Sequence, residues 1–141
     1  MNNAQKELEQ ALKLNPGFPE AMNNLGIVYY QRRDYTSAGW LFLLSDNSKP
    51  DPLVRFNLAK TCLQTGAVDK AREWFEKALQ LQPDYCQVNQ ELGMICLQQG
   101  KNEESLSYLR KAHACTDSQQ QRDKIAEAIQ YVQNKIKKQA K

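Results

Sequence analysis

The sequence predicts an all-α solenoid built from helix-turn-helix repeats, and three observations predict it. Apolar and small residues recur at a spacing of 34 residues, with one step of 33, which is typical of helical repeat arrays. Small residues occupy matched positions in both halves of the unit, and a proline follows most of the second halves. Such an array needs only packing between neighbouring units, which 141 residues with 41% hydrophobic content can supply. We therefore expect a single domain over residues 1–141.

The matched positions define two helices in each unit, called helix A and helix B. Helix A aligns three times, at Leu25, Gly26 and Tyr29, at Leu58, Ala59 and Cys62, and at Leu92, Gly93 and Cys96. Helix B and the residues after it align four times, at Ala4, Leu8, Ala11 and Pro16, at Ala38, Phe42, Ser45 and Pro50, at Ala71, Phe75, Ala78 and Pro83, and at Ser105, Leu109, Ala112 and Asp117. Glycine inside a helix costs about 1 kcal/mol relative to alanine. We therefore expect the small residues to mark where helix A and helix B approach each other closely.

The elements follow in order along the chain. We expect residues 2–14 to form helix B of a repeat whose helix A would lie upstream. Complete repeats are expected at 19–51, 52–85 and 86–119, and the 33-residue step falls at a pair of prolines near residue 50. A last helix at 118–139 carries an apolar stripe at helical spacing, formed by Ile125, Ile129, Val132 and Ile136. Because a terminal repeat needs a polar outer surface, we interpret this helix as a cap; a docking helix for a partner is the alternative.

The turn from helix A to helix B needs a residue that tolerates a left-handed backbone. Gly66 and Gly100 stand at this turn, and glycine adopts that conformation without steric cost. Arg33 stands at the same place in the first complete repeat, so this turn has to absorb a departure from the pattern.

Charge and hydropathy exclude several classes of partner. The net charge is +3 and no dense basic stripe is present, so nucleic acid is not an expected partner. No apolar run approaches the ~20 residues that span a bilayer, so we expect no direct membrane insertion. The N-terminal MNNAQKELEQ lacks the pattern of a signal peptide, and any targeting signal would lie upstream.

The residues that carry chemistry are sparse. His113 is the only histidine, and no glycine-rich phosphate loop or CxxC motif is present. The acidic pair Glu103 and Glu104 falls in the first turn of a helix, where carboxylates suit the helix dipole. Trp40 and Trp74 lie on helix B of successive repeats and are predicted to pack between helices. We expect no enzyme activity, no cofactor and no metal site.

Through the residues that recur at the 34-residue spacing, the chain resembles the tetratricopeptide repeat family along most of its length. The resemblance implies a right-handed superhelical solenoid that binds a protein or peptide in a concave groove lined by the A helices. The groove residues it implies are Asn23, Asn24, Ile27, Tyr30, Leu53, Phe56, Asn57, Lys60, Leu63, Gln87, Gln90 and Met94. They mix apolar groups with amides, which can pair with the backbone of an extended peptide. The alternative is that some of them pack beneath a preceding repeat or the last helix.

One subset of this family holds the C-terminal carboxylate of a chaperone with a clamp of Lys, Asn, Asn, Lys and Arg. The matching places in this chain carry Asn23, Ile27, Asn57, Gln87 and Glu91. Because only Asn57 fits, we do not expect a chaperone tail to be the ligand.

The four cysteines form two pairs. Cys62 and Cys96 occupy the core-facing position of helix A and are expected to be small buried side chains. Cys86 begins helix A of the third repeat and Cys115 ends its helix B, and antiparallel packing would bring these ends together. A disulfide there would stabilise the chain by about 3 to 4 kcal/mol. The alternative is two free thiols in a reducing compartment.

A second resemblance concerns function. The segments QPDYCQVNQELGMICLQQGKNEESLSYLRKAHAC and MNNLGIVYYQRRDYTSAGWLFLLS are similar to tetratricopeptide lipoproteins that act as pilotins for type IV pilus secretins. Some of those lipoproteins have cysteines at positions matching Cys86 and Cys115. The resemblance implies a periplasmic protein at the outer membrane that binds a secretin subunit, although the lipidated cysteine of a pilotin is not in this sequence.

Two alternatives remain open. The segment PDPLVRFNLAKTCLQTGAVDKA resembles cytoplasmic chaperones of type III secretion translocators, although the repeat that follows it does not fit them. The chain could instead be a scaffold segment of a larger protein.

Overall fold

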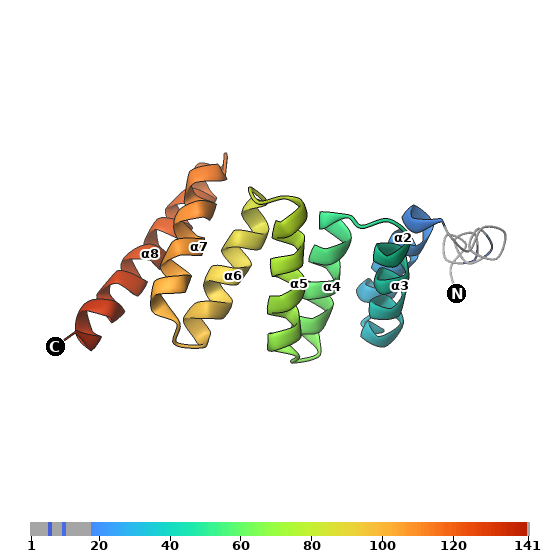
Figure 1. The fold of residues 1–141 in the computed structure, drawn as a ribbon, viewed down its shortest axis with the longest axis horizontal. Helices are drawn as coiled ribbons and strands as arrows, with labels where there is room; N and C mark the ends of the chain where they lie inside the picture. Colours follow the sequence, from blue (N-terminus) through green and yellow to red (C-terminus); the bar gives the residue numbers. More distant parts are fainter. Residues whose placement is uncertain (1–5, 7–9, 11–17, 141) are drawn as a thin grey trace. The chain divides into compact units, whose positions relative to one another are not determined.

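The computed structural model describes Lys6, Gln10 and residues 18–140. The described residues form helices and no strand, as the sequence predicts (Figure 1). The helices are α2 (Pro19–Gln31), α3 (Tyr35–Ser48), α4 (Pro52–Gln64), α5 (Val68–Leu81), α6 (Cys86–Gln98), α7 (Asn102–Cys115) and α8 (Gln119–Gln139). The helix expected at 2–14 lies outside the described residues apart from Lys6 and Gln10. No helix in the described part of the chain is both long and apolar enough to cross a lipid bilayer.

The chain divides into two compact units. The first, Met1–Leu81, contains α2 to α5, and the second, Gln82–Lys141, contains α6 to α8. Helices α2, α4 and α6 begin at the residues where the sequence places the starts of complete repeats. A single domain over residues 1–141 stays a prediction.

In the first unit each helix packs on the next one along the chain, α2 on α3, α3 on α4 and α4 on α5. The core between α3 and α4 consists of Ala38, Phe42, Val54 and Leu58. Gly26 lies against Phe42 so closely that a Cβ atom at Gly26 would stand 2.6 Å from Cε1 of the phenylalanine ring. The absence of a side chain at Gly26 therefore permits the close approach of α2 and α3.

The second unit repeats this arrangement. A Cβ atom at Gly93 of α6 would stand 2.7 Å from the Leu109 side chain of α7. The Ser105 hydroxyl of α7 donates a 2.7 Å hydrogen bond to the Gly93 carbonyl. The apolar stripe of α8 packs on α7, with Ile125 and Val132 fully buried beside Leu109. The small positions are thus points of contact in both units.

The turn between helix A and helix B is left-handed in all three complete repeats. The backbone φ is 81° at Gly66, 75° at Gly100 and 64° at Arg33. A residue with a Cβ atom pays about 1 kcal/mol for this conformation, so the first turn is the strained one. The helix that follows Arg33 is capped, because the Asp34 carboxylate accepts a hydrogen bond of 3.2 Å from the Ser37 backbone N–H.

A partly buried ion pair joins successive repeats. The Arg55 Nε of α4 lies 3.0 Å from an Asp46 carboxylate oxygen of α3. The same guanidinium donates from Nη1 to the Lys77 carbonyl of α5 at 2.9 Å. One side chain therefore fixes α4 relative to both of its neighbours.

Two expectations about packing need correction. Trp40 does not pack between helices, because 63% of its surface is exposed, whereas Trp74 is partly buried against the first core. Cys62 is only half-buried, whereas Cys96 is fully buried as expected. The repeat pattern shows which residues lie on the same face of a helix. It does not show how far the neighbouring helices cover that face.

Replacing Gly93 with Ala is expected to lower the free energy of unfolding by about 1 to 3 kcal/mol, because the added methyl group would overlap Leu109. Chemical denaturation measures this change. Gly39→Ala is the matched control, because a Cβ atom there meets only Thr61 Cγ2, at an ordinary 3.8 Å. The control is expected to gain up to about 1 kcal/mol from helix propensity. Equal losses in the two variants would contradict the close approach.

Candidate functional site

The first unit contains a pocket of ≈ 300 Å³ between α2 and α4, called the α2–α4 pocket. Its lining residues are Ile27, Tyr30, Gln31, Phe42, Phe56, Asn57 and Lys60. The walls are mostly apolar, and an amide and an ammonium group stand among them. Pockets that combine apolar walls with a few polar groups are suited to binding a side chain and fixing its orientation.

The aromatic walls of the pocket are held by packing. The Phe56 ring lies 5.9 Å from the buried Phe75 ring, and Tyr30 meets Tyr35 edge to face at 5.4 Å between centroids. Phe42 is almost fully buried. Tyr30 and Phe56 are therefore half-buried. Rings with restricted motion lose little entropy when a ligand binds.

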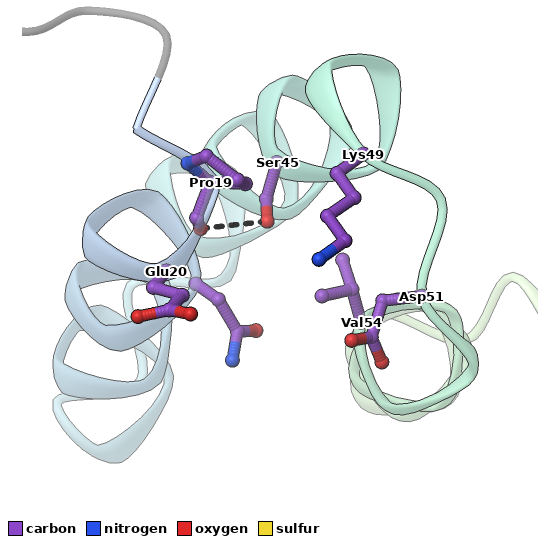
Figure 2. Close-up of a pocket in the computed structure, with 7 residues that line it drawn as sticks. Pro19, Glu20, Ser45, Lys49, Asp51 and Val54 are labelled. Carbon is purple, nitrogen blue, oxygen red and sulfur yellow. Dashed lines mark hydrogen bonds between the residues drawn. The ribbon is translucent and has the colours of Figure 1, made fainter.

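An amide pair connects the two A helices of the first unit. The Asn57 Nδ2 of α4 donates a hydrogen bond of 3.1 Å to the Asn23 Oδ1 of α2. Asn23 also lines a smaller hollow of ≈ 80 Å³ (Figure 2). In this hollow Glu20 of α2 faces Lys49 and Asp51 of the α3–α4 connection. The two hollows therefore meet at a hydrogen-bonded amide pair.

The structure places the predicted groove residues in different surroundings. Ile27, Tyr30, Phe56, Asn57 and Lys60 line the α2–α4 pocket, and Asn23 adjoins it. The residues that line neither hollow are Asn24, Leu53 and Leu63 in the first unit, and Gln87, Gln90 and Met94 on α6 in the second. Leu53 and Met94 expose 48% and 41% of their surface. Their part in a continuous groove stays a prediction.

Phe42 belongs to the pocket, although sequence reasoning did not find it. The prediction counted inward positions on helix A alone, and Phe42 lies on helix B. It reaches the pocket past Gly26, where α2 has no side chain to cover the ring. The glycine at the matched position of helix A was the signal that could have identified it.

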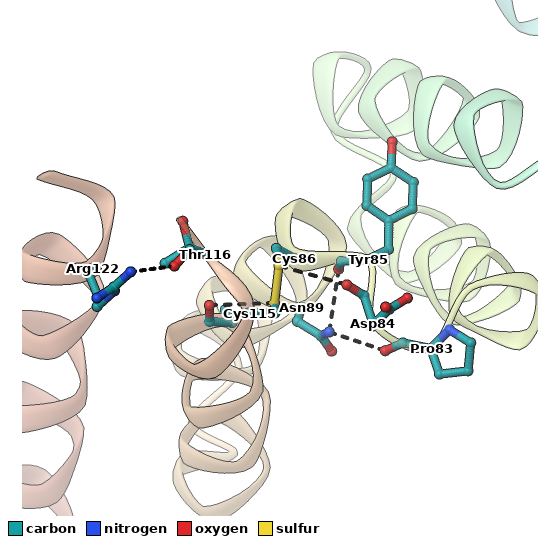
Figure 3. Close-up of a disulfide and its surroundings, with 9 residues drawn as sticks. Pro83, Asp84, Tyr85, Cys86, Asn89, Cys115, Thr116 and Arg122 are labelled. Atoms are coloured by element: carbon teal, nitrogen blue, oxygen red, sulfur yellow. Dashed lines mark hydrogen bonds between the residues drawn. A yellow bond between two sulfur atoms is a disulfide. The ribbon is translucent and has the colours of Figure 1, made fainter. Parts of the chain in front are cut away.

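Cys86 and Cys115 form a disulfide that joins the start of α6 to the end of α7, with their Cα atoms 5.8 Å apart (Figure 3). Asn89, one turn into α6, is buried beside it and donates to the Pro83 carbonyl at 3.4 Å. After α7 the Thr116 carbonyl accepts a hydrogen bond of 2.9 Å from Arg122 of α8. The bridge and these contacts close one end of the second unit.

The remaining chemical groups are dispersed. Among the described residues no three His, Cys, Asp or Glu side chains gather closely enough to hold a metal ion. Burial raises the pKa of the Cys62 thiol, and the nearby Lys70 ammonium partly offsets this effect. A raised pKa keeps this thiol protonated near neutral pH, where it is a weak nucleophile.

Three models of the tetratricopeptide repeat match the chain, over residues 2–52, 52–85 and 87–112. The matches together span most of the sequence and include every helix from α2 to α6. The chain belongs to the tetratricopeptide repeat family, whose members bind protein or peptide partners.

Two curated relatives are longer proteins. The chain is 33% identical over 94 residues to the "Protein CTR9 homolog" of Arabidopsis thaliana, covering 63% of this chain and 9% of that protein. It is 29% identical over 107 residues to the "TPR repeat-containing protein YpiA" of Bacillus subtilis, covering 75% of this chain and 25% of that protein. The chain therefore spans a quarter or less of these relatives.

Solved structures share the fold. MamA AMB-1 is 28% identical with a TM-score of 0.67, over 79% of this chain and 66% of that one. Pseudomonas aeruginosa PilF is 20% identical with a TM-score of 0.77, over 89% and 60%. The Yersinia enterocolitica type III secretion chaperone SycD, in complex with a peptide of the translocator YopD, is 17% identical with a TM-score of 0.72, over 86% and 94%.

Proposed function

We propose that this chain is a non-enzymatic interaction module that binds an extended segment of a partner polypeptide in the α2–α4 pocket. The observation that carries the proposal is the ≈ 300 Å³ apolar pocket between two A helices of a tetratricopeptide protein. An apolar side chain of the partner would enter between Ile27, Tyr30 and Phe56. The desolvation of that side chain would supply most of the affinity.

The polar groups of the pocket would set the orientation of the bound segment. Asn57 uses one amide hydrogen and Asn23 uses its carbonyl oxygen in their mutual hydrogen bond. The other amide atoms of this pair are suited to a peptide backbone, because an amide side chain both donates and accepts. The preformed amide pair would therefore place the backbone of an extended segment beside the apolar pocket.

The pocket can be tested with a peptide selected from a displayed random library on the intact chain. Tyr30→Ala is expected to weaken binding of that peptide by about tenfold or more, because it removes an aromatic wall. Isothermal titration calorimetry measures the dissociation constant. Tyr131→Ala is the matched control, because Tyr131 is 53% exposed on α8 outside the pocket. Unchanged affinity in a folded Tyr30→Ala variant would reject this surface as the binding site.

Within this class we propose a pilotin-like factor that helps a type IV pilus secretin to assemble in the periplasm. The disulfide between Cys86 and Cys115 supports this proposal, because such bridges persist in oxidising compartments. The similarity of residues 82–115 to pilotin lipoproteins supports it as well. A cytoplasmic chaperone of type III translocators is the alternative favoured by the likeness to a peptide-bound chaperone. A scaffold segment is favoured by the small share of the curated relatives that the chain covers.

The thiol count distinguishes these compartments. Protein isolated from its native compartment and unfolded without reductant is expected to show two reactive thiols, from Cys62 and Cys96, and four after reduction. Titration with a thiol reagent gives both numbers. A Cys86→Ser, Cys115→Ser double variant, which shows two thiols in either condition, is the control. Four thiols before reduction would exclude the periplasmic proposal.

A further inference from the structure

The first unit has a second pocket, of ≈ 310 Å³, called the α3–α5 pocket. Its lining includes Gly39, Leu43, Leu58, Cys62, Lys70 and Trp74. It shares no lining residue with the α2–α4 pocket. Helix α4 separates the two, because Phe56 and Lys60 line one pocket while Leu58 and Cys62 lie about 120 to 160° away around the helix axis and line the other.

A glycine in the lining has no explanation in the packing of the helices. Gly39 lies in the interior of α3, where glycine costs about 1 kcal/mol relative to alanine. Gly26 and Gly93 recover this cost through close helix contacts. A Cβ atom at Gly39 would meet only Thr61 at 3.8 Å, so no close contact requires glycine there. The missing side chain does leave the pocket open.

Two exposed apolar side chains of α3, of which Leu43 lines the pocket, also depart from the repeat. Trp40 is 63% exposed and Leu43 is 40% exposed. At the matched positions α5 carries Glu73 and Glu76, and α7 carries Ser107 and Arg110. The same places on two sister helices are therefore polar, as expected of surface exposed to water. Exposed apolar residues that gather around a pocket are typical of an interaction surface.

The charge at the pocket indicates the chemistry of its partner. Among the described residues that line the pocket, Lys70 is the one with a charged side chain, and its charge is positive. A second ammonium group, Lys77 Nζ, lies 4.4 Å from the centroid of the Trp74 ring, which lines the pocket. Positive charge beside apolar walls complements a segment that carries carboxylates next to an apolar side chain.

We propose that the α3–α5 pocket docks a protein segment that presents an aromatic or large aliphatic side chain flanked by carboxylates. The apolar side chain enters between Leu43, Leu58 and Trp74, and the carboxylates face Lys70. This surface is separate from the α2–α4 pocket, so one chain would hold two different segments at once.

The half-buried Cys62 thiol provides a reporter for the test, because it lines the pocket. The rate at which a maleimide modifies Cys62 in the intact chain is measured by mass spectrometry with two capped tripeptides. One is acetyl-Glu-Phe-Glu-amide and the other is acetyl-Lys-Phe-Lys-amide. The acidic peptide is expected to protect Cys62 with an affinity about fivefold higher than that of the basic one.

Three variants locate the effect. Lys70→Glu is expected to reverse the preference between the peptides, and Gly39→Leu is expected to abolish protection because its side chain fills the pocket. Tyr131→Ala, which lies on α8 and lines neither pocket, should leave protection unchanged. Equal protection by both peptides, or none by either, would overturn the proposal. Protection that rises with the concentration of the chain alone would also overturn it, because a second copy would then be the occupant.

Discussion

The contact between a glycine of helix A and a large side chain of helix B is the constraint on which the rest of the structure depends. Gly26 against Phe42 brings α2 and α3 together, and Gly93 against Leu109 does the same for α6 and α7. Each contact fixes the spacing of one helix pair, and the next helix then packs against helix B. Because the Phe42 ring also lines the α2–α4 pocket, the contact that forms the first pair also shapes the binding site.

Polar contacts complement this apolar constraint between successive repeats. Asn57 and Asn23 connect two A helices, and Arg55 connects Asp46 with the backbone of α5. These groups are directional, so they fix the register of neighbouring helices in a way that apolar packing alone does not. The first unit therefore presents its two pockets on a rigid frame. A rigid frame reduces the entropy that is lost when a peptide is bound.

The sequence predicts the fold well and the site only in part. The period and the small residues identify the helix pairs, because every repeat solves the same packing problem. Because Gly66 and Gly100 occupy the turn in the later repeats, the matched position of Arg33 predicts that its backbone is left-handed and strained. The exposure of Trp40 and the half-burial of Phe56 could not be predicted in this way. Each depends on which atoms of a neighbouring helix lie across from it, such as the Phe75 ring near Phe56, and a periodic pattern does not contain that information.

A double-mutant cycle between Gly26→Ala and Phe42→Ala tests the central contact most directly, with the free energy of unfolding as its readout. We expect the double variant to be more stable, by about 1 kcal/mol or more, than the sum of the two single losses predicts, because alanine at position 42 leaves room for the new methyl group. Additivity of the two losses within about 0.5 kcal/mol would contradict the account, because residues in contact should not behave as independent sites.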